Sequence, residues 1–149
     1  MLSTVKEIEI SYKERFLTSV ETAITNSNQA AELLYQSFDP NTIALQETFK
    51  ILLLNNSNSI KGIYTHSIGG ITGTVVDIRI MFAVILKSLT TAVILCHNHP
   101  SGKLKASEQD RELTRKILKA GFYLDVKILD HIILSPDGQY FSFADKGIL

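Results

Sequence analysis

The stretch T91-AVILCHNHPSGKLKASEQ-D110 decides the fold class of this chain. It begins with a run of apolar residues at 92–95, which predicts a buried strand over 91–97. A loop with the sequence His-Pro-Ser-Gly follows, and a helix is expected from Ser107, whose side chain can cap it. A buried strand that leads into a helix predicts an α/β domain.

Outward from this stretch, the sequence predicts further strands and helices. We expect strands where apolar residues alternate with polar ones, and helices where apolar residues recur at helical spacing after a capping side chain. The expected helices cover 26–38, capped by Asn26; 78–88, capped by Asp77; and 107–120, stopped by Gly121. The expected strands cover 8–12, 47–54, 59–67, 91–97, 123–134 and 139–143, and those at 47–54 and 59–67 form an antiparallel hairpin.

Length and composition are those of a soluble globular protein with a single domain. The chain has 149 residues, of which 45% are apolar and 20% charged. We expect one domain over 1–149, made of an N-terminal extension (a strand and a helix) at 1–45 and a core at 46–149. Acidic and basic residues number 15 each, so the net charge supports neither nucleic acid nor a membrane as a partner.

Cysteine content and hydropathy bear on the compartment. Cys96 is the single cysteine, which excludes an internal disulfide and fits a reducing environment. The start of the chain carries no apolar segment of the signal-peptide type, and the apolar runs are too short to span a bilayer. We therefore expect a cytoplasmic protein without membrane contact.

Two histidines and an aspartate form a candidate metal site. His97 and His99 are two positions apart in an extended segment, so their rings can point to the same face. Asp110 follows in the first turn of the expected helix. Two imidazoles and one carboxylate leave a fourth tetrahedral position open, as in catalytic zinc sites. The pattern predicts one Zn²⁺ ion with its fourth position open for water.

Each part of this pattern also has a simpler explanation. Paired histidines at a strand end can be polar residues on the rim of a loop. Ser107 and Asp110 have the spacing of a helix capping box, in which the two side chains bond each other's backbone. Capping does not explain the two histidines upstream, so the combined pattern favours the metal. The two roles are compatible, since the cap can hold Asp110 in place.

The same residues resemble a known superfamily. His97-x-His99, seven intervening residues, Ser107, two more and Asp110 resemble the JAMM (JAB/MPN) metalloprotease signature. Asn98, the Pro-Ser-Gly at 100–102 and the Leu-Asp-His-Ile-Ile at 129–133 are similar to the RadC branch, from about residue 46 to the C-terminus. The resemblance implies a curved mixed β-sheet flanked by helices, with a cytidine deaminase-like architecture. It is to a short form, without the N-terminal helix-hairpin-helix region of longer RadC proteins.

The resemblance also implies roles for individual residues. His97, His99 and Asp110 would be the metal ligands, Glu47 the general base, and Ser107 a group that stabilises the oxyanion. The implied reaction is hydrolysis of a peptide or isopeptide bond in a peptide or protein substrate.

One more residue, Asp130, has a predicted role near the ligands, and three alternative functions remain to be compared. Asp130 either accepts the second ring N–H of a ligand histidine or forms a polar pair with its neighbour at a strand edge. A nucleobase deaminase needs a Pro-Cys-x-x-Cys motif, which one cysteine cannot supply. A DNA repair-associated or DNA-binding role has little support from charge, and a metal-free MPN interaction module fits poorly with a full ligand set.

Overall fold

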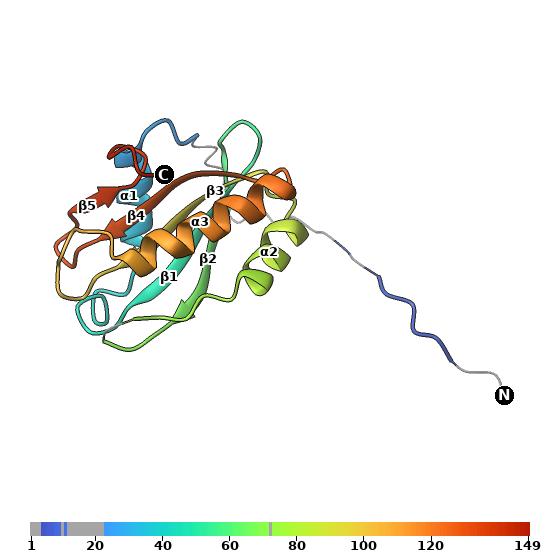
Figure 1. Ribbon diagram of the computed structural model, residues 1–149, viewed down its shortest axis with the longest axis horizontal. Coiled ribbons are helices and arrows are strands. Elements are labelled where there is room, and N and C mark those ends of the chain that lie inside the picture. Colours follow the sequence, from blue (N-terminus) through green and yellow to red (C-terminus); the bar gives the residue numbers. More distant parts are fainter. Residues whose placement is uncertain (1–3, 10, 12–22, 72) are drawn as a thin grey trace.

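A five-stranded mixed sheet with helices on both faces forms the centre of the molecule (Figure 1). The computed structural model describes residues 4–9, 11, 23–71 and 73–149. The predicted α/β class and the mixed sheet flanked by helices are confirmed. Along the chain the elements are α1 (Ser27–Gln36), β1 (Thr48–Leu54), β2 (Ile60–Ile68), α2 (Ile78–Lys87), β3 (Ala92–Asn98), α3 (Glu108–Tyr123), β4 (Lys127–Leu134) and β5 (Tyr140–Ser142).

The strands lie in the order β2-β1-β3-β4-β5. The predicted hairpin of β1 and β2 is confirmed, and β1 also pairs antiparallel with β3. Strands β3 and β4 are parallel, as a strand–helix–strand connection through α3 requires. Strand β3 therefore lies in the middle of the sheet, between β1 and β4.

Alternation along β3 divides the core into two layers. Ala92, Ile94 and Cys96 pack with α1 on one face of the sheet. Val93 and Leu95 pack with α2 and α3 on the other face. His97 continues this second series, so its ring points towards α3 while Cys96 faces away from it.

The end of α3 differs from the expectation at Gly121. The helix passes through Gly121 and ends at Tyr123, and Asp125 then takes a φ of 55°. A Cβ at Gly121 would lie 2.6 Å from the carbonyl oxygen of Val126. Gly121 is therefore required because the chain that leads into β4 passes close to the helix. It does not end the helix. Because the helix is longer than expected, β4 begins at Lys127 and not at residue 123.

The N-terminal region agrees with the expectations in part. Asn26 caps α1 as predicted, and its side chain accepts the N–H of Gln29 at 2.9 Å, although the helix ends at Gln36 and not at residue 38. Of the strand expected at 8–12, residues 8, 9 and 11 are in no strand, and residues 10 and 12 lie outside the described residues. Within the described ranges, no helix is long and apolar enough to cross a membrane.

Candidate metal centre

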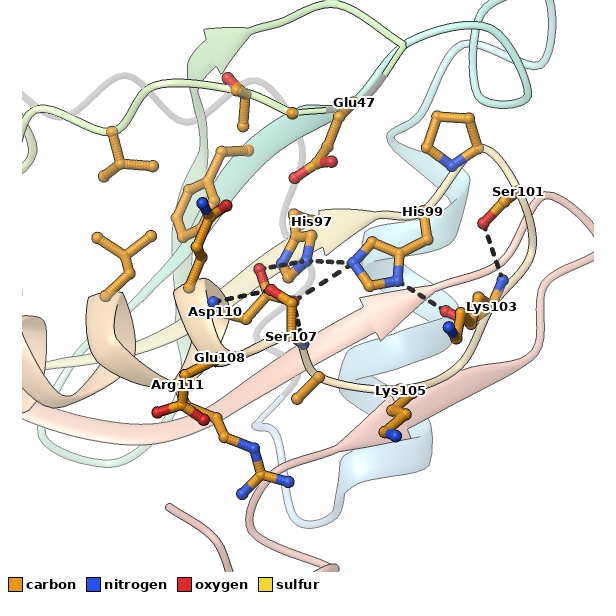
Figure 2. Close-up of a pocket in the computed structure, with 18 of the residues that line it drawn as sticks. Glu47, His97, His99, Ser101, Lys103, Lys105, Ser107, Glu108, Asp110 and Arg111 are labelled. Carbon is orange, nitrogen blue, oxygen red and sulfur yellow. Dashed lines mark hydrogen bonds and ion pairs between the residues drawn. The ribbon is translucent and has the colours of Figure 1, made fainter.

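The end of β3 and the first turn of α3 bring the three predicted ligands together (Figure 2). The Nε2 atoms of His97 and His99 are 3.0 Å apart. One carboxylate oxygen of Asp110 lies 3.3 Å from His97 Nε2, and the other lies 3.5 Å from His99 Nε2. His97 is 1% exposed and Asp110 14% exposed, so the group lies at the bottom of a depression that remains open to solvent.

These spacings are those of ligands around one small cation. Zinc bonds to nitrogen and oxygen are about 2.0–2.1 Å long, which places two ligands of a tetrahedral ion about 3.3 Å apart. The three donors can therefore occupy three corners of one tetrahedron. The His97–His99–Asp110 group could bind a metal ion, as the spacing in the sequence predicts.

Asp110 belongs to the metal group and to a helix cap at the same time. Its carboxylate accepts the N–H of Ser107 at 2.9 Å, and the Ser107 hydroxyl oxygen accepts the N–H of Asp110 at 3.0 Å. Burial acts to raise the pKa of Asp110, but its contacts with His97 and His99 and the N–H of Ser107 outweigh burial and hold the pKa well below its usual range. The capping box thus presents an ionised carboxylate to the two imidazoles.

Each ligand histidine is held through its other ring nitrogen. His99 Nδ1 lies 2.7 Å from the carbonyl oxygen of Lys103, which can only accept, so Nδ1 carries the hydrogen. His97 Nδ1 lies 2.8 Å from Nε2 of His131, which comes from β4. The Nδ1 of His131 in turn lies 2.6 Å from the hydroxyl oxygen of Thr114 on α3.

Asp130 is not the residue that supports a ligand histidine. Its carboxylate accepts the backbone N–H groups of His131 and Ala144 and the hydroxyl of Ser142. Of the two roles left open for Asp130, the contact with the ring of His97 is made instead by His131, because neighbouring residues in a strand point to opposite faces. The side chain of Asp130 therefore lies on the opposite face of the sheet from the ligands and joins β4 to the C-terminal segment.

Glu47 lies next to the metal group, one residue before β1. The antiparallel register pairs Phe49 with His97, and continued outward it brings Glu47 opposite His99 on the same face. Figure 2 shows the Glu47 carboxylate turned towards the two histidine rings. Burial raises the pKa of Glu47, opposed in part by His97 and His99, so this carboxylate is a stronger base than an exposed one.

Asn98 fixes the backbone on either side of Glu47. Its fully buried side chain accepts the N–H of Thr48 at 2.7 Å. Its amide nitrogen donates to the carbonyl oxygens of Ile43 and Gln46, at 2.7 and 3.0 Å. The residue between the two histidines thus ties the segment that carries Glu47 to the end of β3.

Asn98→Ala is expected to lower the free energy of unfolding by on the order of 3 kcal/mol, because it leaves buried backbone groups without partners. Urea unfolding followed by circular dichroism measures this change. The control is Asn41→Ala, an exposed residue near the same segment, for which a change within about 0.5 kcal/mol is expected. If Asn98→Ala lowers the free energy of unfolding no more than Asn41→Ala does, the hydrogen bonds of Asn98 do not stabilise this segment.

A cleft of about 980 Å³ opens over the metal group. Glu47, the His-His-Asp group and Ser107 line it, and Phe49, Val76 and Leu113 form its apolar wall. Lys103, Lys105 and Arg111 line it as well. The structure therefore brings Glu47, Ser107 and the His-His-Asp group into one cavity.

The supporting residues were missed in the sequence. Thr114 has the appearance of an ordinary helix residue, and His131 stands beside the more obvious candidate Asp130. No local signal separates His131 from Asp130, because apolar residues stand on both faces of β4 and its register against β3 shifts between Val93 and Ile94. Asn98 had no signal either, because its partners are backbone atoms distant in sequence.

The open mixed sheet and the His-His-Asp group at the C-terminal end of β3 define a class, the JAB/MPN-type α/β domains. Residues 24–148 match the family described as the RadC-like JAB domain, and the chain belongs to this family. The resemblance seen in the sequence is therefore confirmed.

Several bacterial relatives are named UPF0758 protein. That of Flavobacterium johnsoniae is 51% identical over 102 residues, which are 68% of this chain and 44% of the relative. That of Porphyromonas gingivalis is 41% identical over 128 residues, 85% of this chain and 55% of the relative. The chain spans about half the length of the curated relatives it matches.

Proposed function

We propose that this chain is a zinc-dependent hydrolase, a metallopeptidase that cleaves a peptide or isopeptide bond. The observation that carries the proposal is the position of Glu47, a half-buried carboxylate of raised pKa turned towards a His-His-Asp donor set. A structural metal site has no need of such a base, whereas hydrolysis requires one. One zinc ion suits two imidazoles and one carboxylate with an open fourth position.

The residues around the donor set divide the work of hydrolysis. When bound, zinc supplies the Lewis acidity that makes water reactive near neutral pH. Glu47 takes the proton of the attacking water and delivers it to the leaving amine, and its raised pKa suits both transfers. His97, His99 and Asp110 would hold the ion, and their donor atoms lie beside this carboxylate.

We assign to Ser107 the role of stabilising the oxyanion. Within the cap its oxygen acts as an acceptor, so the cap does not use its hydroxyl hydrogen. That hydrogen can be donated to the substrate carbonyl oxygen as negative charge develops on it. Since Ser107 caps α3, its backbone is held by the same turn that presents Asp110.

The cleft favours a peptide or protein substrate with acidic groups near the bond that is cut. Lys103, Lys105 and Arg111 line the cleft, and Glu108 at its rim pairs with Arg115 at 3.0 Å. The rim thus carries several cations that can attract carboxylates or phosphates. A cytoplasmic location suits this chain, whose buried Cys96 is a thiol in the structure.

The test combines metal analysis with a substrate screen. Protein purified without added zinc is expected to hold about one zinc ion per chain by mass spectrometry of the metal content. A chelator should abolish cleavage in a library of peptides and isopeptides, and added zinc should restore it. Cleavage should also be faster for acidic members of the library than for neutral ones. Cleavage that survives complete removal of metal would refute the proposal.

A further inference from the structure

We propose that Thr114 and His131 act as a tautomer relay, which keeps the ring hydrogen of His97 on Nδ1 and leaves its Nε2 free for the metal. Both are positioning residues, since they act through His97 and do not line the cleft. The proposal rests on the proposed function in one respect, namely that His97 binds a metal through Nε2.

The relay begins at the single hydroxyl hydrogen of Thr114. The Thr114 hydroxyl oxygen lies 2.6 Å from the backbone carbonyl oxygen of Asp110, which has no hydrogen to give. Two oxygens at this distance need a hydrogen between them, so the hydroxyl donates to the carbonyl. The same hydroxyl lies 2.6 Å from Nδ1 of His131 and can only accept there. His131 therefore carries its hydrogen on Nδ1.

The surroundings of His131 keep its ring neutral. The residue is fully buried, and its ring stacks on Phe143 with centroids 4.6 Å apart and contacts Phe49 edge-on. Burial in this apolar setting disfavours a charged imidazole. A neutral ring with its hydrogen on Nδ1 has a bare Nε2, which accepts a hydrogen bond from His97 Nδ1 at 2.8 Å.

The consequence falls on the metal group. With its hydrogen on Nδ1, a neutral His97 presents a bare Nε2 to His99 and Asp110. His99 does the same, because its Nδ1 donates to the carbonyl of Lys103. Two nitrogen lone pairs and a carboxylate then converge within 4.8 Å, an arrangement that a cation stabilises.

The relay also links two ligands of the same ion. It starts at the backbone of Asp110 on α3, passes through His131 on β4, and ends at His97 on β3. A hydrogen bond from a helical threonine to the carbonyl four residues earlier is common without any further role. What distinguishes Thr114 is the second bond of its hydroxyl, to a buried imidazole that itself holds a ligand.

The experiment compares Thr114→Val with the matched control Thr114→Ser. Valine keeps the shape of threonine without the hydroxyl, and serine keeps the hydroxyl. Long-range ¹H–¹⁵N spectra of the metal-free protein, recorded near pH 8 where ordinary imidazoles are neutral, show which ring nitrogens carry hydrogen. Affinity for zinc is measured in parallel by competition with a chromophoric chelator.

The native protein and Thr114→Ser should show hydrogen on Nδ1 of both His131 and His97. In Thr114→Val both rings should shift towards the Nε2–H form, and zinc affinity should fall roughly 10- to 100-fold, the range for loss of a partner behind a ligand. A native His131 with hydrogen on Nε2 would overturn the relay, even if the variant fails to fold. So would a Thr114→Val variant that binds zinc as tightly as the native protein. Failure of the native protein to bind zinc would contradict the proposed function instead, and its spectra would still decide the relay.

Discussion

Glu47→Gln is expected to reduce turnover roughly 10²- to 10⁴-fold, the contribution of a positioned general base, while zinc content stays at the native level. Glutamine keeps the shape of the side chain but cannot take a proton from water. His97, His99 and Asp110 come from β3, the residue that follows it, and α3, so they remain in place when Glu47 changes. Steady-state rates on a peptide identified in the screen, measured beside metal content, test both parts.

The matched control is Glu112→Gln, which removes an exposed carboxylate of α3 that does not line the cleft. Its turnover should equal that of the native protein. If Glu47→Gln retains native turnover, Glu47 is not the base. If it loses zinc together with activity, its role is to support the metal and not to move the proton.

Asp110→Asn should weaken zinc binding by more than about 100-fold. Loss of a partner behind a ligand already costs roughly 10- to 100-fold, and this change removes the one charged ligand itself. Asparagine can still accept the N–H of Ser107, so the cap of α3 and the fold are expected to persist. Competition with a chelator measures the affinity, and circular dichroism measures the helix.

Glu108→Gln is the matched control for this variant. Glu108 is an acidic residue of the same first turn and has the same favourable interaction with the helix dipole. Its pairing with Arg115 is exposed and contributes little. Zinc affinity of this control should stay near the native value, and a loss equal to that of Asp110→Asn would indicate a general effect of charge at the helix start.

Local patterns in the sequence predicted most of the elements and the grouping of His97, His99 and Asp110. The strand at β3, the capped helices α1 and α2 and the hairpin all follow from rules that act within a few residues. His97, His99 and Asp110 belong to one strand–loop–helix segment, so their meeting follows from its geometry. The placement of Glu47 beside them depends on pairing between β1 and β3, and it was expected from the resemblance to a family.

Contacts between distant segments explain what the sequence did not predict. Gly121 was predicted to stop the helix. What requires glycine there is the carbonyl oxygen of Val126, which leaves no room for a Cβ, and this contact cannot be seen in the sequence. The role of Asp130 was left open between support for a ligand histidine and a polar pair with its neighbour, because the face to which each side chain points depends on the register of β4. Such features depend on packing that is set only when the sheet has assembled.

The strand–loop–helix origin of the three donors bears on how metal and folding are coupled. A chain that has lost its sheet still carries His97, His99 and Asp110 close together in sequence, and so keeps part of its affinity for zinc. Binding to the unfolded chain offsets binding to the native one, so the metal should raise the free energy of unfolding by less than its native affinity alone would give. Glu47 lies beside the donors only when β1 has paired with β3. Hydrolytic activity should therefore require the native sheet, whereas bound zinc does not require it.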